Sequence, residues 1–499
     1  MLFLGIDVGT SGCKTLLLDD TGTVLCSDTQ TYPLSHPRSG WYEQSPEDWW
    51  QAVCVSIQCI MKKAAAAPAD IGCIGLSAQM HGLVALDKNN HVLRPAILWN
   101  DQRSTAQCDE ILKLVGGLDN LLALTNNNII PGYTASKILW MRENEPELFA
   151  QTCRVMNPKD YIRYRLTGEW ITEVSDASGT GLFDVKNRCW SDKLLQILDI
   201  SRALLPKCCE STEITGGLTS EAANQTRLAE GTPVSGGGGD AVIQTTGSGL
   251  LEKGVMATII GTAGIVAAGL NEFVPNVNGE LQMFCNNAPG LWHMMGVSFC
   301  AGEAYKWYKN LLFKNGVPDG GNPYNTLNTW AAQSPAGSNR LLFLPYICGE
   351  RCPHNDANTR GAFIGLEYSH TLQDMTRSVM EGVCFNMRQI GDKMPVQVKE
   401  IRASGGGAQS PLWLQIMADV FQQPVVCTYG AEEGGAYGAA LVAGISIKHW
   451  RTPDEAMSTI RKKSVTEPNT ANREIYDELY GIYKQIYPAL QSVNGLLAK

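Results

Sequence analysis

Apolar residues in this chain gather in short runs separated by small polar turns. Residues 2–6 form one run and residues 15–18 another, and the segment 9–12 between them contains only Gly, Thr and Ser. Two apolar runs around such a turn predict a β-hairpin. A further turn at residues 20–22, followed by Val24-Leu25, extends the prediction to an N-terminal meander with a tight polar loop at its first bend.

Helical and extended patterns then alternate along the chain. Residues 46–53 have a helical pattern, whereas residues 71–76 form a strand-like apolar run that leads directly into the segment 77–82, Ser-Ala-Gln-Met-His-Gly. Strands that alternate with helices predict an α/β fold.

The hairpin pattern recurs in the second half of the chain. Residues 254–260 and 265–268 are apolar and flank Gly261-Thr262-Ala263-Gly264. The recurrence indicates a diverged duplication, with chance repetition of an ordinary hairpin as the alternative. Four consecutive glycines, 236–239, precede Asp240. They imply backbone that bends or approaches a ligand closely, which suits a domain junction.

Length predicts the number of domains, and charge argues against one class of partner. A chain of 499 residues exceeds what one hydrophobic core organises, so two domains are expected. With 44% hydrophobic and 18% charged residues, it is expected to be soluble and globular. The net charge of −9 and the lack of Lys/Arg runs argue against nucleic acid as a partner.

Two further features bear on the cellular setting. No apolar window approaches the ~18–20 residues that span a bilayer, and the segment 1–7 has no basic leader, so we expect a cytoplasmic protein that does not enter membranes. The 16 cysteines are scattered, without a CxxC pair; Cys348 and Cys352 come closest to a ligand spacing. Reduced thiols are therefore expected, in preference to zinc or disulfides.

The first polar loop has the composition of a phosphate-binding turn. Gly9, Thr10 and Ser11 expose backbone N–H groups and hydroxyls that could cradle phosphate oxygens, with Lys14 nearby. It is not a Walker A loop, because Gly and Lys are not adjacent and a strand follows. Asp7, beside the loop, could hold a hydrated Mg²⁺ that bridges nucleotide phosphates. An ordinary glycine-rich turn is the alternative.

Two loops in the second half could complete a nucleotide site. The Gly261-Thr262 hairpin could clasp a triphosphate together with the first loop. Gly405, Gly406 and Gln409 lie in a third glycine cluster, between a strand-like segment and a helical one. Such a side-chain-free turn leaves room for a base and ribose on the backbone, and a mere tight turn is the alternative.

These segments, in this order, resemble the FGGY carbohydrate kinases. The resemblance rests on the Asp-x-Gly-Thr-Ser hairpin at 7–11, the glycines before Asp240, the Gly-Thr hairpin at 261 and the glycine cluster at 405; it extends essentially over the full length and includes residues 40–44, 99–103, 158–161 and 344–346. It implies two actin-like (ribonuclease H-like) α/β ATPase domains with a cleft between them. We expect a sugar-binding domain over 1–245 and a nucleotide-binding domain over 246–499.

Within that family, Gln79-Met80-His81-Gly82 together with Trp99-Asn100-Asp101 is similar to the xylulokinases, in which the Met-His pair lies against the sugar. The resemblance implies that Gln79, Met80, His81, Trp99, Asn100 and Asp101 bind a ketopentose, with D-xylulose the expected substrate and D-xylulose 5-phosphate the product. Gluconokinases share the Met-His pair, so gluconate is the nearest rival. The remaining histidines are interpreted as structural: His36, His91, His293, His354, His370 and His449.

The family's catalytic base falls on Asp240. A carboxylate on a glycine-flanked turn can approach a sugar hydroxyl and take its proton as the γ-phosphoryl group of ATP arrives. The resemblance also implies Mg²⁺, held through water by Asp7 and Asp240. Two residues depart from the pattern: Ala241 replaces a common Asn that would bond to the sugar, and Ala263 replaces a Ser near the phosphates. We expect the second change to alter nucleotide affinity.

Two other classes of function compete with a sugar kinase. An actin-like ATPase switch could share the fold, although the segment Gln79 to Gly82 argues against it. A catalytically silent sugar sensor is the other, and the presence of Asp240 argues against it. The sequence leaves open the identity and handedness of the ketose and the oligomeric state, a homodimer included.

Overall fold

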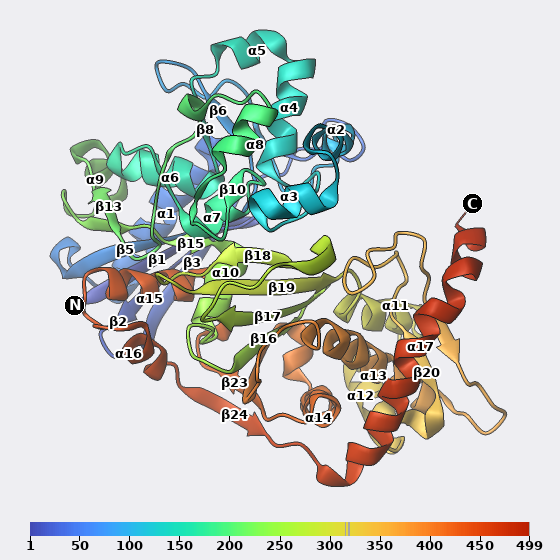
Figure 1. Cartoon of the computed structure of the whole chain (residues 1–499). Helices are drawn as coiled ribbons and strands as arrows, with labels where there is room; N and C mark the ends of the chain where they lie inside the picture. The colour runs from blue at the N-terminus through green and yellow to red at the C-terminus, as the bar shows by residue number, and fades with distance from the viewer. Residues whose placement is uncertain (315, 318–319, 499) are drawn as a thin grey trace. The chain divides into compact units, whose positions relative to one another are not determined.

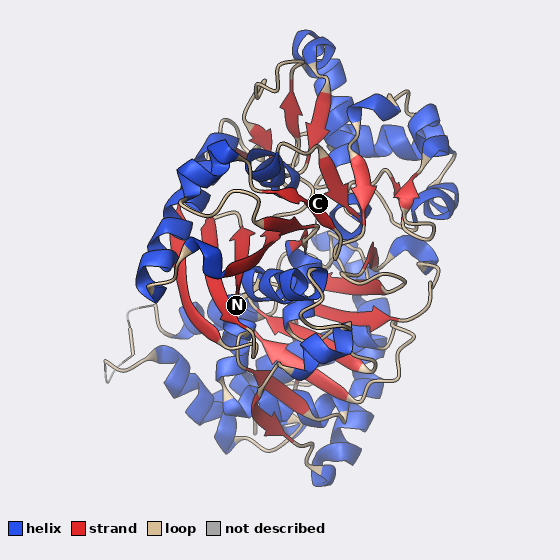
Figure 2. Cartoon of the chain, turned by 90° about the vertical axis from the view of Figure 1, so that its left-hand side faces the viewer, coloured by secondary structure: helices blue, strands red, loops and turns tan. Residues whose placement is uncertain are grey.

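The structure, a computed structural model, describes residues 1–314, 316–317 and 320–498. The chain forms two compact units, and each combines β-sheet with packed helices (Figure 2). Unit 1 comprises Met1–Lys253, Gly269–His293 and Glu433–Arg461; unit 2 comprises Gly254–Ala268, Met294–Glu432 and Lys462–Lys499. The domain boundary between residues 245 and 246 stays a prediction.

The main sheet of unit 1 confirms the predicted N-terminal meander. Its strand order is β13-β14-β5-β1-β2-β3, and β15 also pairs with β5. β1 runs antiparallel to β2 and parallel to β5, and this register places Asp7 opposite Lys14 and Ser77. The strands are β1 (Leu2–Val8), β2 (Gly12–Asp19), β3 (Val24–Thr31), β5 (Ile71–Ala78), β13 (Ile214–Gly217), β14 (Pro233–Ser235) and β15 (Gly238–Gly239).

Alternate residues of β1 serve two different layers of unit 1. Leu4, Ile6 and Val8 join the core cluster formed with helix α1 (Pro46–Ala64), whereas Phe3 joins the cluster formed with helix α15 (Gly435–Ser446). This follows from the two-residue period of a strand. Both α1 and α15 are drawn beside this sheet in Figure 1.

Glycines allow α15 to lie directly on the sheet. A Cβ atom added at Gly5 would lie 2.0 Å from the carbonyl oxygen of Ala436, and one added at Gly75 would lie 1.9 Å from that of Ala439. No larger residue fits either position without moving the helix. The close packing fixes the N-terminus of α15 next to the end of β1, where Asp7 lies.

The four-glycine segment lies inside unit 1. Gly238 and Gly239 form β15, and helix α10 (Asp240–Gly247) begins directly after them. Gly237 has a φ of +69°, and a Cβ at Gly239 would lie 2.5 Å from the Met80 Cγ atom. The glycines therefore permit close approach to neighbouring segments, and the unit boundary follows later, at Lys253.

The other elements of unit 1 surround this sheet or lie beyond its ends. Its remaining helices of five residues or more are α2 (Thr105–Val115), α3 (Leu118–Thr125), α4 (Thr134–Asn144), α5 (Pro146–Gln151), α6 (Pro158–Thr167), α7 (Val174–Ser178), α8 (Asp192–Ile197), α9 (Ser220–Thr226) and α16 (Pro453–Ser458). Its short strands are β4 (Glu43–Gln44), β6 (Val84–Leu86), β7 (Ala96–Ile97), β8 (Arg154–Met156), β9 (Ile171–Glu173), β10 (Phe183–Asp184), β11 (Cys189–Trp190), β12 (Lys207–Cys209) and β18 (Gln282–Cys285).

Unit 2 repeats the hairpin topology of unit 1. β16 runs antiparallel to β17 and parallel to β22, as β1 does to β2 and β5. β22 is parallel to β23, and β23 is antiparallel to β24. The strands are β16 (Val255–Ile260), β17 (Gly264–Leu270), β19 (Trp292–Ser298), β20 (Leu342–Leu344), β21 (Ala362–Ile364), β22 (Glu400–Ser404), β23 (Val425–Thr428) and β24 (Lys462–Thr466). This shared topology agrees with the duplication inferred from the sequence.

The helices of unit 2 pack around its sheet. They are α11 (Gly302–Leu312), α12 (Pro323–Gln333), α13 (Leu372–Gly391), α14 (Pro411–Phe421) and α17 (Arg473–Leu497). The helical segment predicted after the third glycine cluster is confirmed as α14, and the helix predicted at 46–53 is confirmed as part of α1. Within the described part of the chain, every helix is too short or too polar to cross a membrane.

Candidate functional site

Asp7 occupies a tightly enclosed position near the end of β1. The Ser77 hydroxyl donates a hydrogen bond of 2.6 Å to its Oδ1 atom. A Cβ at Gly435 would lie 2.8 Å from the same oxygen, so a residue with a side chain does not fit at this position at the start of α15. Burial raises the pKa of the Asp7 carboxyl, and the Ser77 hydrogen bond and the Lys14 charge oppose that rise.

A hydrogen-bonded network joins the first glycine-rich loop to the predicted sugar residues. The Trp99 indole N–H donates to Thr10 Oγ1 (2.9 Å), and the Thr10 hydroxyl donates to Gln79 Oε1 (3.2 Å). The Gln44 side-chain amide donates to the Thr10 carbonyl (2.7 Å), and that of Gln79 donates to Gln44 Oε1 (2.9 Å). Three predicted residues therefore lie together, with Gln44 as the link that the prediction did not assign.

His81 is held in an unusual backbone conformation. Its φ is +69°, outside the regions that most residues adopt. Its carbonyl accepts hydrogen bonds from Thr134 Oγ1 (3.1 Å) and Lys137 Nζ (2.9 Å). The ring Nδ1 lies 2.6 Å from the Gly179 carbonyl oxygen, and because a carbonyl can only accept, Nδ1 carries the proton. The ring also packs against Tyr133, with centroids 4.7 Å apart.

Glycines on both sides leave room for the Met-His pair. A Cβ at Gly179 would lie 2.6 Å from His81 Cε1, and a Cβ at Gly239 would lie 2.5 Å from Met80 Cγ. Met80 is buried. The glycine before Asp240 thus packs directly against the segment that the resemblance assigns to the sugar.

Asp240 begins helix α10 and lies in the electric field of a second carboxylate. Its Oδ1 accepts a 2.7 Å hydrogen bond from the Ala241 N–H. Burial, and then the negative charge of Asp7, raise the pKa of Asp240 to about 7, against the effect of hydrogen bonds from the backbone of Ala241 and Met80. A carboxylate with a pKa near neutrality suits general-base chemistry.

The three residues of the segment 99–101 differ in exposure and in hydrogen bonding. Trp99 is 46% exposed and reaches Thr10, as described above. The Asn100 Oδ1 atom is buried and accepts no hydrogen bond from the described residues. Asp101 has no solvent exposure and accepts four hydrogen bonds, from the Tyr42 N–H and from Arg103 N, Nε and Nη2. Asp101 therefore anchors its loop here, and its contact with a sugar stays a prediction.

The remaining residues of the first loop form a compact turn. The Gly9 N–H donates to the Gly12 carbonyl (3.0 Å), and the Gly9 carbonyl accepts from the Tyr32 hydroxyl. Ser11 is exposed. Lys14 forms an ion pair of 3.1 Å with Glu433, which the sequence prediction did not anticipate.

Unit 2 contains a pocket of about 490 Å³ that brings together four of the nine predicted nucleotide residues. Gly261, Thr262, Gly406 and Gln409 line it, and Gly405 directly precedes Gly406. The sequence prediction missed the rest of the lining, which includes Ile260, Gly302, Glu303, Tyr305, Lys306, Asn322, Tyr324, Asn325, Asn328, Gly407, Ser410 and Trp413.

Backbone contacts explain why glycines form this pocket. The Gly302 N–H donates to the Gly261 carbonyl (2.8 Å), and a Cβ at Gly302 would lie 2.4 Å from that oxygen. Gly405 has a φ of +86°, and a Cβ there would lie 2.6 Å from the Ile260 carbonyl oxygen. A Cβ at Gly406, by contrast, meets nothing within 4 Å. The strand ends therefore pack closely while the pocket itself stays open.

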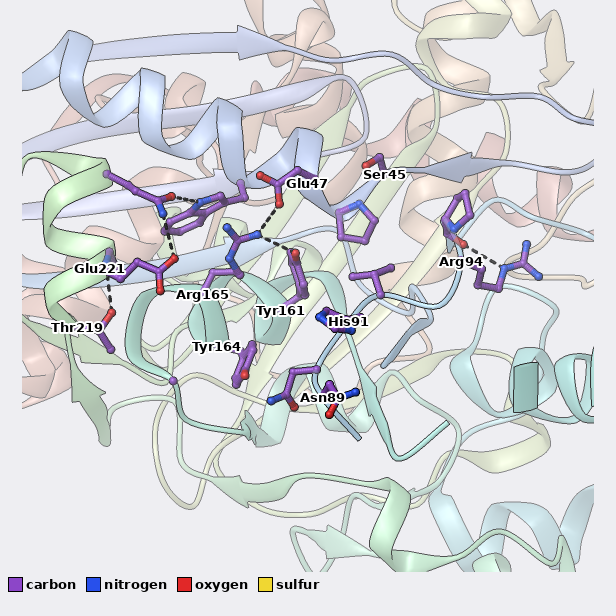
Figure 3. A pocket seen from close by; sticks show the side chains of 18 residues that line it. Ser45, Glu47, Asn89, His91, Arg94, Tyr161, Tyr164, Arg165, Thr219 and Glu221 are labelled. Carbon is purple, nitrogen blue, oxygen red and sulfur yellow. Dashed lines mark hydrogen bonds and ion pairs between the residues drawn. The ribbon is translucent and has the colours of Figure 1, made fainter. Parts of the chain in front are cut away.

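A larger hollow, of about 930 Å³, lies elsewhere in unit 1 and contains none of the predicted site residues (Figure 3). Several of its polar groups already have partners. Arg165 forms an ion pair with Glu47 (2.6 Å) and donates to the Tyr161 hydroxyl (2.9 Å). We therefore assign the functional site to the two regions described above.

Known proteins match the chain along almost its whole length. The N-terminal domain of the FGGY family of carbohydrate kinases matches residues 2–247, and the C-terminal domain of that family matches residues 256–447. A xylulose kinase from Bacillus subtilis (strain 168) is 35% identical over 498 residues, which cover 99% of this chain and 98% of that protein.

Solved structures agree with that match. A crystal structure named as a xyloylose kinase from Brucella ovis is 34% identical, with a TM-score of 0.91, and the match covers 99% of this chain and 100% of that one. A gluconate kinase structure from Lactobacillus acidophilus also has a TM-score of 0.91, at 27% identity and 99% coverage of both chains. The two-domain α/β, actin-like fold expected from the sequence is confirmed.

Proposed function

Because the chain belongs to the FGGY family of carbohydrate kinases, we propose that it transfers the γ-phosphoryl group of ATP to D-xylulose and forms D-xylulose 5-phosphate and ADP. One observation carries the choice of sugar: a xylulose kinase is 35% identical to this chain over 99% of its length. The gluconate kinase structure shares the fold at the lower identity of 27%, which makes gluconate the second candidate.

We place the sugar beside the network of Thr10, Gln79 and Trp99. The Asn100 Oδ1 atom is buried and has no hydrogen-bond partner among the residues that the structure describes, so it offers an acceptor to a sugar hydroxyl that would satisfy an otherwise costly polar atom. His81, fixed by Gly179, would orient the sugar. These groups come from three separate segments of the chain, so their convergence favours a polyhydroxylated ligand.

Asp240 is proposed as the general base. Its carboxylate would accept the proton of the attacked sugar hydroxyl while the hydroxyl oxygen forms a bond to the γ-phosphorus. The bond between that phosphorus and the bridging oxygen of ADP breaks in the same step. The pKa of about 7 for Asp240 allows a substantial deprotonated fraction at neutral pH.

ATP is proposed to bind in the 490 Å³ pocket of unit 2. Aromatic rings from Tyr305, Tyr324 and Trp413 line one part of it, whereas Gly261 and Thr262 supply backbone and hydroxyl groups. This combination suits a purine base together with phosphates. Dependence on ATP also makes the cytoplasm the proposed location.

Asp7 and Asp240 offer the kind of carboxylate groups that bind Mg²⁺. Among residues 1–314, 316–317 and 320–498, no three Asp, Glu, His or Cys side chains cluster as metal ligands, but Mg²⁺ is commonly held by only one or two carboxylates together with nucleotide phosphates. The negative charge of Asp7 raises the pKa of Asp240, so a cation near both carboxylates would relieve their repulsion. Asp7 and Asp240 would hold Mg²⁺ through water, where it would neutralise phosphate charge.

ATP turnover with and without sugar tests this function. A kinase should hydrolyse ATP slowly alone and consume it rapidly with D-xylulose, with one phosphorylated sugar formed for each ADP. An actin-like switch ATPase would show the same ATP turnover in both conditions, and a silent sensor would bind the sugar and form no product. Either of the last two results would contradict the proposal.

His81→Ala should impair use of the sugar and spare the nucleotide. Losing one sugar hydrogen bond and the ring contact should lower kcat/KM for D-xylulose by about 10- to 100-fold, with KM for ATP within about twofold of wild type. Steady-state kinetics with each substrate varied in turn measures both effects.

Gly406→Val, in the proposed nucleotide pocket, is the matched variant for His81→Ala. Its side chain would enter open space in the nucleotide pocket, so KM for ATP should rise while KM for the sugar stays the same. Melting temperatures of both variants should stay near that of wild type. A His81 variant that keeps its sugar kinetics, or loses only ATP affinity, would remove His81 from the sugar site.

A further inference from the structure

Two cysteines of unit 2 place their thiol groups in direct contact. The Sγ atoms of Cys300 and Cys348 are 3.3 Å apart. A disulfide bond is ~2.05 Å long, so the two sulfurs need to approach by only about 1.3 Å to become bonded. Cys300 is 4% exposed, whereas Cys348 is exposed and accessible to small oxidants.

We propose that Cys300 and Cys348 are a modification site at which a peroxide forms a disulfide that weakens binding of ATP. The part of this inference that concerns ATP rests on the proposed function. The disulfide itself depends only on the geometry of the two thiols.

The loops that carry the two cysteines are already fastened together. Glu350 is buried and accepts hydrogen bonds from the Ser298 hydroxyl (2.7 Å), the Phe299 N–H (3.0 Å), the Arg351 N–H (2.8 Å) and the Asn386 side-chain amide (2.8 Å). These bonds span the segments on either side of the cysteine pair. Closing the disulfide therefore needs little additional ordering of the chain.

The proposed oxidation has two steps: the exposed Cys348 sulfur reacts first, and the buried Cys300 sulfur reacts second. The Cys348 thiolate would attack one peroxide oxygen; the O–O bond breaks, one water leaves after protonation, and Cys348 becomes a sulfenic acid. The Cys300 sulfur then attacks the Cys348 sulfur, the S–O bond breaks and a second water leaves. Two thiols are thus oxidised to one disulfide while hydrogen peroxide is reduced to two waters. Burial raises the pKa of Cys300 to about 12, which fits the resolving role better than the first attack.

Cys300 is directly connected to the proposed nucleotide pocket. The next residue, Ala301, donates its N–H to the Thr262 carbonyl (3.0 Å), and Gly302 donates to the Gly261 carbonyl (2.8 Å). No atom can be added at Gly302 without meeting that carbonyl. A shift at Cys300 is therefore expected to move the Gly261-Thr262 hairpin, which lines the pocket.

Peptide mapping of the full-length protein after hydrogen peroxide treatment tests the disulfide. Trypsin separates the two cysteines, because Lys306 and Arg340 lie between them in the sequence. We expect a cross-linked peptide pair that is lost on reduction and absent from Cys348→Ser. Cys153→Ser, which removes an exposed cysteine of unit 1, is the matched control and should retain the cross-link. Oxidation of Cys348 to higher acids with Cys300 unmodified would overturn the proposal.

Calorimetric titration with ATP tests the consequence. Disturbing one or two hydrogen bonds of the hairpin should weaken ATP binding by about five- to tenfold in the oxidised protein, and dithiothreitol should restore it. Cys348→Ser should bind ATP equally before and after peroxide. A disulfide that forms and leaves the Kd for ATP unchanged would overturn the proposed effect. Failure of the reduced protein to bind ATP would contradict the proposed function, whereas the peptide map would still decide the disulfide.

Discussion

Asp240→Asn is expected to lower kcat by about 10²–10⁴-fold while D-xylulose and MgATP still bind within about tenfold of their wild-type affinities. The amide keeps the shape of the side chain but cannot accept the hydroxyl proton. Folding should change little, because the amide oxygen can still accept the hydrogen bond from the Ala241 N–H. Measuring kcat and the sugar Kd on the purified variant separates proton transfer from binding.

An aspartate outside the site provides the control for this variant. Asp109→Asn changes an exposed residue of α2 and should leave kcat unaffected. If Asp240 also holds Mg²⁺ through water, the Mg²⁺ dependence of Asp240→Asn should change together with kcat. A kcat within a few-fold of wild type would exclude Asp240 as the base, and Asp7 would be the next carboxylate to test.

Lys159→Met is expected to destabilise unit 1 strongly. The Lys159 Nζ atom lies 2.8 Å from Asp160 Oδ1, 3.6 Å from Glu173 Oε1 and 3.5 Å from Asp176 Oδ2, and all four side chains are buried. Asp160 keeps its 2.8 Å ion pair with Arg163, but removing the ammonium group of Lys159 takes away the cation that neighbours the buried carboxyl groups of Glu173 and Asp176. Breaking a buried ion pair in this way costs about 3–5 kcal/mol of the free energy of unfolding.

Urea denaturation followed by fluorescence measures this loss of stability. Lys193→Met, at an exposed lysine of α8, is the matched control and should shift the midpoint little. A Lys159 variant with the same urea midpoint as wild type would show that the cluster does not depend on this cation. Because Ser175, next to Asp176, accepts a hydrogen bond from the Gly239 N–H, partial loss of kcat should accompany the destabilisation.

The local elements of the fold could be predicted because each depends on a short stretch of sequence. The hairpins predicted at 2–18 and 254–268 follow from apolar runs around Gly-Thr turns, and the structure has them as β1-β2 and β16-β17. The packing of α15 on the sheet could not be predicted in this way. It depends on contacts between Gly5 and Ala436, which are more than 400 residues apart in the sequence.

In the candidate site, too, features with a local sequence signal could be predicted, and features that depend on contacts between distant segments could not. Thr10, Gln79 and Trp99 were predicted from loop composition and resemblance, and the structure joins them in one network. Gln44 and Gly179 were not assigned, because an amide that links two loops and a carbonyl that fixes a histidine tautomer carry no local signal in the sequence. Gln44 does fall in the segment 40–44 that contributed to the resemblance, and this was the one available clue.

The four-glycine segment shows what composition alone leaves undecided. Glycines in a row indicate freedom to bend or room for close contact, and the sequence does not distinguish these two uses. In the structure Gly239 leaves room for Met80, and the segment lies within unit 1. The segment therefore serves close contact at Gly239, and the domain boundary between residues 245 and 246 stays a prediction.

Phosphorylation of D-xylulose by this chain is tested most directly by kcat/KM for a panel of sugars with ATP and Mg²⁺. The panel contains D-xylulose, the other D- and L-pentuloses, gluconate and glycerol. We predict the highest kcat/KM for D-xylulose, with glycerol a poor substrate. A clear preference for gluconate or for an L-ketose would contradict the substrate assignment.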